Sequence, residues 1–227
     1  LQRNNVRSIL VEIGKINAAK GFYSTALKSF YRCREYNSAP DNIIEMCMNI
    51  IKIQCCTGNA SRSQTYLSKA ENSLTPEDTI IHAQLQAASG LVSLACGNCK
   101  TAAHKFLEVP FCIGQTFSEI IVPEDIATYG VLCALATFSR KELRSSVMTN
   151  RPFKNFLELV PHLQKLLDSF YQCNYFEFLT LLEQWRPLGE MDFFLSSHLE
   201  RLLQDIRNRA LIQYFSPYLS VSIRTMA

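Results

Sequence analysis

Apolar residues recur at helical spacing through most of this chain, and glycines interrupt the pattern at regular distances. Gly21, Gly58 and Gly97 stand 37 and 39 residues apart, so the first half of the chain consists of three repeats. Small residues follow five positions after these glycines and bulky apolar residues nine positions after them: Ala26, Ser63 and Ala102, then Phe30, Leu67 and Phe106.

Each repeat predicts a helical hairpin. The glycine ends the first helix because it adopts a left-handed conformation that a side chain would resist. The small residue lets the second helix approach closely, and the bulky residue fills the space between the two. The predicted helix pairs span residues 6–20 and 23–35, 42–56 and 60–73, and 77–95 and 99–109. One hairpin cannot bury both of its faces, so we expect a right-handed solenoid of tetratricopeptide-like hairpins.

The regular pattern lapses where Pro110, Gly114 and Pro123 follow one another, and it breaks again near residues 150–152. Further helices are predicted at residues 124–138, 161–173, 175–185 and 192–214, before Pro217. Strand alternation with hairpin turns is missing, which favours an all-α fold. We place a repeat domain at residues 1–150 and a second helical unit at residues 151–227.

Three segments of the second half carry a resemblance: DIATYGVLCALATFSRKEL (125–143), FKNFLELVPHLQKLLDSFYQCNY (153–175) and IRNRALIQYFSPYLSVSIRTMA (206–227). They resemble the COP9 signalosome subunit 1 family and, more distantly, its counterpart in the proteasome lid. The resemblance implies helical repeats followed by a PCI domain, a helical bundle capped by a winged helix. Residues 151–227 would then hold an incomplete bundle, with the winged helix truncated.

The resemblance also implies a function, that of a non-catalytic scaffold in the complex that removes Nedd8 from cullins. Expected partners are the other signalosome subunits and cullin-RING ligases, in nucleus and cytoplasm. The first residue is not Met and the last residues are apolar, which indicates a part of a longer protein. We therefore expect a monomeric fragment in which Tyr218, Leu219, Val221, Ile223 and Met226 lack packing partners.

The amino-acid composition argues against several other classes of protein. The chain has 23 basic and 20 acidic residues, spread evenly, and a net charge of +3, so it lacks the basic footprint of a nucleic-acid binder. Its apolar runs are too short to span a membrane. Most of its nine cysteines stand among apolar residues, which is typical of free thiols in a reducing compartment.

Candidate chemistry is sparse. Cys96, Cys99, His104 and Cys112 are residue types that bind structural zinc, but the repeat register already accounts for their positions, so we predict no cofactor. Motifs of metallopeptidases, serine hydrolases and nucleotide-binding enzymes are missing, which favours a protein that is not an enzyme.

Two clusters suit a partner surface as well as ordinary packing. Arg201, Arg207 and Arg209, with Arg224, form either a docking patch for an acidic partner or a solvated face paired with interleaved acids. An aromatic group around residue 174 is interpreted as core packing at a turn, or else as a groove for a partner: Phe170, Tyr171, Tyr175, Phe176 and Phe178. A proteasome lid subunit, a free-standing peptide adaptor and a zinc-dependent nucleic-acid binder remain alternatives.

Overall fold

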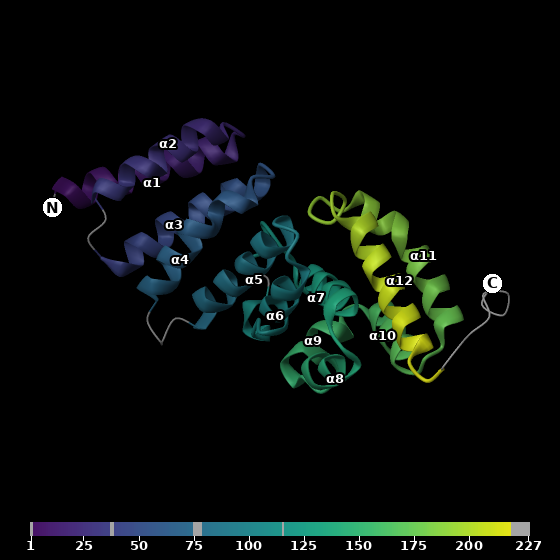
Figure 1. Ribbon diagram of the computed structural model, residues 1–227. Coiled ribbons are helices and arrows are strands. Elements are labelled where there is room, and N and C mark those ends of the chain that lie inside the picture. The colour runs from purple at the N-terminus through teal and green to yellow at the C-terminus, as the bar shows by residue number, and fades with distance from the viewer. Residues whose placement is uncertain (1, 37–38, 75–78, 115, 219–227) are drawn as a thin grey trace.

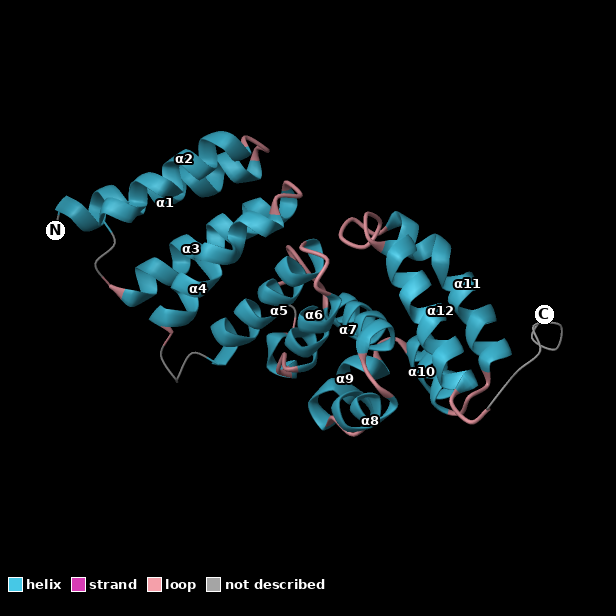
Figure 2. Ribbon diagram, in the orientation of Figure 1, coloured by secondary structure: helices cyan, strands magenta, loops and turns pink. Residues whose placement is uncertain are grey.

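The computed structural model describes residues 2–36, 39–74, 79–114 and 116–218, which form helices joined by turns (Figure 2). Within those ranges no residue belongs to a β-strand. The prediction of an all-α fold is therefore confirmed for the described part of the chain.

Three helical hairpins lie side by side in a row in the first part of the chain (Figure 1). Their first helices are α1 (Gln2–Ala19), α3 (Pro40–Cys56) and α5 (Thr79–Ala95). Their second helices are α2 (Tyr23–Cys33), α4 (Gln64–Ser73) and α6 (Cys99–Leu107). Short 3₁₀ turns extend α2 at Arg34–Tyr36 and precede α4 at Ala60–Ser63. The predicted helix pairs are confirmed, with ends that differ by a few residues; predicted positions 77 and 78 lie outside the described residues.

Each of these hairpins turns at a glycine with a left-handed backbone. The φ angle is +81° at Gly21, +70° at Gly58 and +75° at Gly97. In every turn the glycine N–H donates to the carbonyl three residues back, and the following N–H donates to the carbonyl five residues back. This double hydrogen bond is the Schellman motif, which satisfies the last helix carbonyls and reverses the chain.

A match of side-chain size sets how closely the two helices of a hairpin approach. In the first and third hairpins a glycine faces a buried ring, Gly14 against Phe30 and Gly90 against Phe106, and a Cβ on either glycine would lie 2.6 Å from that ring. The same two repeat positions hold Ile51 and Leu67 in the second hairpin, both buried. Where the first helix has glycine, the second helix has phenylalanine. Where the first helix has the larger isoleucine, the second helix has leucine, which is smaller than phenylalanine. A larger residue on one helix thus accompanies a smaller one on the other, as close packing requires.

Helix α7 (Pro123–Thr137) is the centre of the molecule. The helices α6, α9, α10 and α12 all pack on it. Ile126–Ala136 is buried except at Thr128, in keeping with a helix that is apolar all round. A 3₁₀ turn at Phe111–Ile113 lies between α6 and α7. The connection that follows this turn is packed, since Phe117 and Ile121 are buried.

The segment between residues 139 and 160 contains helices that the sequence analysis did not predict. They are α8 (Arg140–Glu142), a π-helical turn (Leu143–Met148) and α9 (Arg151–Glu158). Ser139 and Glu142 cap the first of them reciprocally, with the Ser139 N–H donating to the Glu142 carboxylate over 2.7 Å. The predicted break at 150–152 is the start of α9, where the Asn150 side chain accepts a hydrogen bond from the Phe153 N–H.

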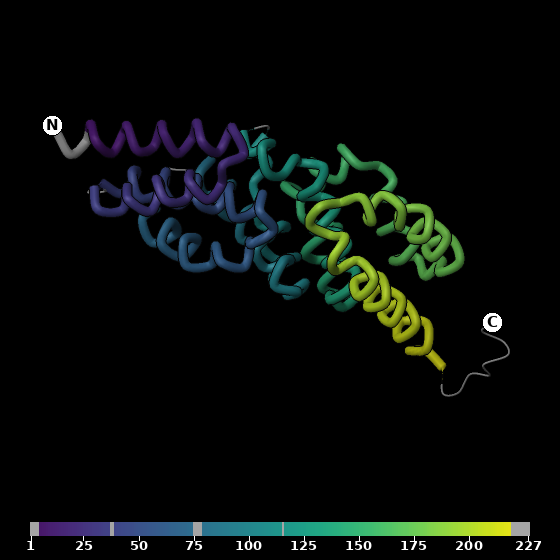
Figure 3. Tube along the Cα trace, turned by 90° about the horizontal axis from the view of Figure 1, so that it is seen from above, coloured from purple at the N-terminus to yellow at the C-terminus, as the bar shows by residue number. Residues whose placement is uncertain are grey.

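Three further helices complete the described chain: α10 (Pro161–Tyr171), α11 (Tyr175–Met191) and α12 (Leu199–Phe215). The turn from α10 to α11 repeats the double hydrogen bond of the earlier hairpins, but Cys173, with φ +62°, takes the place of glycine. Seen from above, α1 and α12 lie at opposite ends of the molecule (Figure 3).

The prediction of a helix that begins at residue 192 was wrong, because α11 continues to Met191 and α12 begins only at Leu199. The Asp192 carboxylate accepts hydrogen bonds from the N–H groups of Phe194 and Leu195, at 2.9 and 2.8 Å, and from the Tyr129 hydroxyl at 2.7 Å. These bonds hold the chain in turns between the two helices.

Buried side chains from Val11 to Ala210 form one continuous cluster. The division into domains at residue 150 stays a prediction. Of the helices in the described part of the chain, none is long and apolar enough to cross a membrane. The expectations for Leu219, Val221, Ile223, Arg224 and Met226, and for the start of a winged helix, lie outside the described residues.

Candidate interaction surfaces

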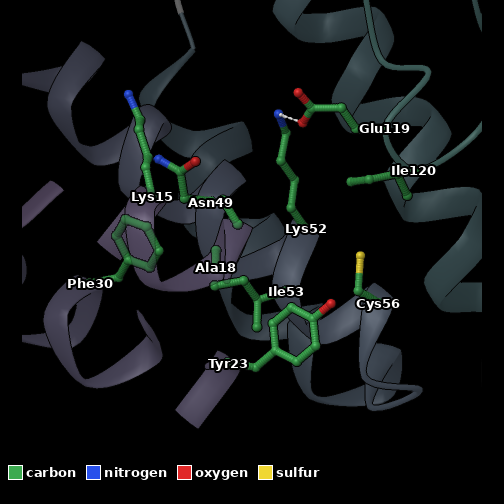
Figure 4. A pocket seen from close by; sticks show the side chains of 11 residues that line it. Lys15, Ala18, Tyr23, Phe30, Asn49, Lys52, Ile53, Cys56, Glu119 and Ile120 are labelled. Carbon is green, nitrogen blue, oxygen red and sulfur yellow. Dashed lines mark hydrogen bonds and ion pairs between the residues drawn. The ribbon is translucent and has the colours of Figure 1, made fainter. Parts of the chain in front are cut away.

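A groove of about 450 Å³ lies between the first and second hairpins (Figure 4). Its walls come from α1, α2, α3 and the segment before α7: Lys15, Ala18, Ala19, Tyr23, Phe30, Asn49, Lys52, Ile53, Cys56, Glu119 and Ile120. The polar side chains Lys15, Asn49 and Lys52 lie toward one edge, and Ile53 and Tyr23 lie toward the other (Figure 4). A second cavity of about 440 Å³ shares those three polar residues and extends past α3 to Gln84 of α5.

Ion pairs balance the charges of this groove. Lys52 Nζ lies 2.8 Å from Glu119 Oε2, and Lys15 Nζ lies 3.0 Å from Glu45 Oε1. The hydrogen bond and charge of Lys52 lower the pKa of the Glu119 carboxyl. Because the pairs are partly exposed, each contributes no more than about 1 kcal/mol to stability. The Lys52–Glu119 pair joins α3 to the segment before α7, and the Lys15–Glu45 pair joins α1 to α3. Together they leave the groove without a strong net charge.

The residues of this groove were not predicted from the sequence, although a signal was present. Lys15 and Lys52 both stand six residues before a turn glycine, so they occupy one position of the repeat and point to one face of the row. Glu119 could not have been found in this way, because it belongs to the irregular connection before α7.

The three candidate arginines of α12 do not form a single patch. Arg207 pairs with Glu183 of α11. Arg209 Nη2 donates to the Thr137 carbonyl at 2.8 Å and thereby caps the end of α7. Arg201 lies at the turn of the third hairpin, where its Nη1 would be 3.7 Å from a Cβ added to Gly97. Their role as a partner surface stays a prediction.

The structure brings together two residues that the sequence analysis considered separately, Gly97 and Arg201. Arg201 also lies near Cys99, at the start of α6. The pKa of the Cys99 thiol is lowered, chiefly because Cys133 donates a hydrogen bond to it and further because of the Arg201 charge. Burial raises the pKa of Cys47 to about 11 and that of Cys55 to about 12, so these two remain neutral thiols within the core.

The four residues considered as zinc ligands lie close together in the sequence, but their side chains have different environments in the structure. Cys96 and Cys112 are exposed, Cys99 is half-buried, and the His104 ring packs against Phe138 with centroids 4.7 Å apart. In the ranges that the structure describes, no three His, Cys, Asp or Glu side chains are grouped as metal ligands. The zinc content of the protein stays a prediction for metal analysis.

The aromatic group around residue 174 divides between core and surface. Phe170 and Phe178 are buried with ring centroids 5.0 Å apart, which confirms the interpretation as core packing for these two. Tyr171 lies under the Arg140 guanidinium, 4.9 Å from it, whereas Phe176 is exposed. A single exposed aromatic side chain is common on protein surfaces and does not define a groove.

Comparison with known proteins extends this picture to a family. The family model described as 26S proteasome subunit RPN7 matches residues 1–146, and the model described as PCI domain matches residues 182–227. COP9 signalosome complex subunit 1 of Arabidopsis thaliana is 38% identical over 227 residues, which are 100% of this chain and 52% of that protein. Subunit 1b of Drosophila melanogaster is 39% identical over 217 residues, which are 91% of this chain and 40% of that protein.

Similarity to the proteasome is weaker and covers less of the chain. The 26S proteasome non-ATPase regulatory subunit 6 of Oryza sativa subsp. japonica is 27% identical over 146 residues, which are 63% of this chain and 36% of that protein. The chain spans about half the length of the curated signalosome relatives that it matches across its whole length.

Stacked helical hairpins followed by a region that matches the PCI model define a helical-repeat protein of the PCI class. The chain belongs to the COP9 signalosome subunit 1 family and is more distantly related to the proteasome subunit RPN7. The resemblance drawn from the three segments of the second half is thereby confirmed.

Proposed function

We propose that this protein is a non-catalytic scaffold subunit of a COP9 signalosome and supports deneddylation of cullin-RING ubiquitin ligases through protein–protein contacts. The observation that carries the proposal is the extent of the similarity. Signalosome subunit 1 from Arabidopsis thaliana aligns with 100% of the chain, while the proteasome subunit of rice aligns with 63% of it at lower identity. A scaffold also suits a row of hairpins that share one core and present extended surfaces.

The finer architecture is part of the proposal. The hairpins form a right-handed, tetratricopeptide-like solenoid that leads into the helical portion of a PCI domain at residues 151–227. The match of the PCI model to residues 182–227 supports that position. The fragment itself is monomeric, its partners are the other signalosome subunits and cullin-RING ligases, and the whole protein works in nucleus and cytoplasm.

A proteasome subunit and a free-standing peptide adaptor are the competing functions within the same class. The groove between the first two hairpins would suit an adaptor, but its lysines already pair with Glu45 and Glu119 of the chain itself. Similarity to signalosome subunits along the whole chain favours the signalosome over both.

Affinity purification of the tagged natural polypeptide from its own cells tests the proposal. We expect other signalosome subunits to co-purify, and the purified complex to remove Nedd8 from a neddylated cullin. The chain of 227 residues alone should show no such activity. Recovery of proteasome subunits in their place, or of no stable partner, would contradict the proposal, as would cleavage by the isolated chain that a substitution within it abolishes.

A further inference from the structure

Helix α1 exposes a stripe of three isoleucines, which we call the α1 stripe: Ile9, Ile13 and Ile16. Their side chains are 58%, 42% and 51% exposed. The spacing of four and three residues places them on one face of the helix. The first hairpin, which includes α1, forms one end of the row of hairpins (Figure 1).

The equivalent positions are buried in both of the following hairpins. Counted back from the turn glycines, the stripe corresponds to Met46, Ile50 and Ile53 of α3 and to Leu85, Ser89 and Val92 of α5. In α3 these side chains are 4%, 0% and 4% exposed, and in α5 they are 1%, 7% and 0% exposed. The repeat therefore uses these positions as a contact face, and only in α1 is that face open.

In the second hairpin, Ile53 of this face lies against the hairpin before it. The Ile53 side chain shares a cavity wall with Ala18 of α1 and with Tyr23 and Phe30 of α2 (Figure 4). Helix α3 contacts both helices of the first hairpin, and α5 contacts both helices of the second. In both of these hairpins, therefore, the helix that buries these positions packs on the hairpin before it.

We infer that the α1 stripe packs under a further helical hairpin, contributed by the natural polypeptide outside these 227 residues and stacked on α1 as the first hairpin stacks on α3. What points to this occupant is the repeat register of α1, not the position at which the sequence starts. Arabidopsis subunit 1 is longer than the region that it shares with this chain, which is 52% of that protein.

A second copy of the chain fits the stripe less well. Three partly exposed aliphatic side chains offer far less than the roughly 800 Å² per partner that a stable interface buries. A stacked hairpin needs no such area, because it is tethered to the same chain and adds one nearest-neighbour contact to an existing row. The inference about this surface does not depend on the proposed scaffold function, because a subunit of the signalosome or of the proteasome could have the same surface.

Site-specific labelling tests the inference. Ile13→Cys and, as a matched control, Lys28→Cys are placed in the 227-residue chain and in the full natural polypeptide, and maleimide labelling of each is followed by peptide mass spectrometry. Lys28 is exposed, as are Thr65 and His104 at the same position of the other hairpins, so this control remains accessible in a stacked repeat. Ile16→Cys provides a second site in case one variant folds poorly.

We expect both cysteines to react at similar rates in the 227-residue chain. In the full polypeptide, labelling at position 13 should slow by about tenfold or more relative to position 28, because reaction then requires local opening. Equal rates in the two proteins would overturn the inference. Slow labelling that depends on concentration in the shorter chain, or that appears only when other subunits are added, would also overturn it by identifying a different occupant.

Discussion

Substitution of alanine for Gly90 separates two opposite expectations for the third hairpin. Considered as a helix position alone, the change should stabilise the protein by about 1 kcal/mol, because glycine in a helix interior is unfavourable by that amount relative to alanine. The tertiary packing predicts the reverse. The added Cβ would lie 2.6, 2.7 and 2.8 Å from three carbons of the Phe106 ring, closer than carbon atoms can approach.

The Phe106 ring has little room to move away from the added Cβ. Phe106 is fully buried and its ring centroid lies 5.8 Å from that of Tyr129 on α7. Its own Cβ would be 3.4 Å from a Cβ added to Gly130 on the same helix. Overpacking costs about 1–3 kcal/mol, and a confined ring belongs near the upper end of that range. After the gain in helix propensity, Gly90→Ala should lower the free energy of unfolding by about 1–2 kcal/mol.

Urea unfolding followed by circular dichroism measures this change. Thr101→Ala, at an exposed position of α6, is the control and should stay within about 0.5 kcal/mol of the parent. Adding Phe106→Leu to Gly90→Ala should recover at least about 1 kcal/mol relative to the sum of the single changes, because leucine is the residue at this position in the second hairpin. A stabilised Gly90→Ala protein, or strict additivity of the two changes, would refute the size match across the hairpin.

Three further outcomes are expected. Gly97→Val should lower the free energy of unfolding by about 1–3 kcal/mol, since a β-branched residue is forced to positive φ, while Gln84→Val should cost less than half as much; equal losses in urea would contradict the turn assignment. Cys173→Gly should raise the free energy of unfolding by about 0.5–1 kcal/mol, because glycine removes the strain of a left-handed residue, and a loss in the same assay would contradict this. Metal analysis should find no stoichiometric zinc, and serine at both Cys96 and Cys99 should leave the unfolding midpoint nearly unchanged; about one equivalent of bound zinc would reverse that conclusion.

Local chemistry explains which elements could be predicted. The three hairpins follow from glycines and from small and bulky residues within ten positions of each turn, so the information for them is contained in short segments. The turn at Cys173 has the same hydrogen bonds without glycine, and no turn glycine marked it in the sequence, although the predicted helices at 161–173 and 175–185 meet there. Helix α9 was not predicted, because its first turn contains Pro152 and a proline often interrupts a helix, although proline is well tolerated in the first turn.

The sequence by itself determined the helical class, the register of the repeats and, through three recognisable segments, the family. Only the tertiary structure decided which distant residues meet. Lys52 pairs with Glu119 across 67 positions, Tyr129 holds Asp192 across 63, and Arg209 caps α7 at Thr137 across 72. Such contacts depend on how whole helices pack around α7, and that packing cannot be predicted from the spacing of residues along the sequence. The same reason applies to the α1 stripe, since its isoleucines occupy positions that are buried in the other two hairpins, and only the tertiary structure shows that they are exposed in α1.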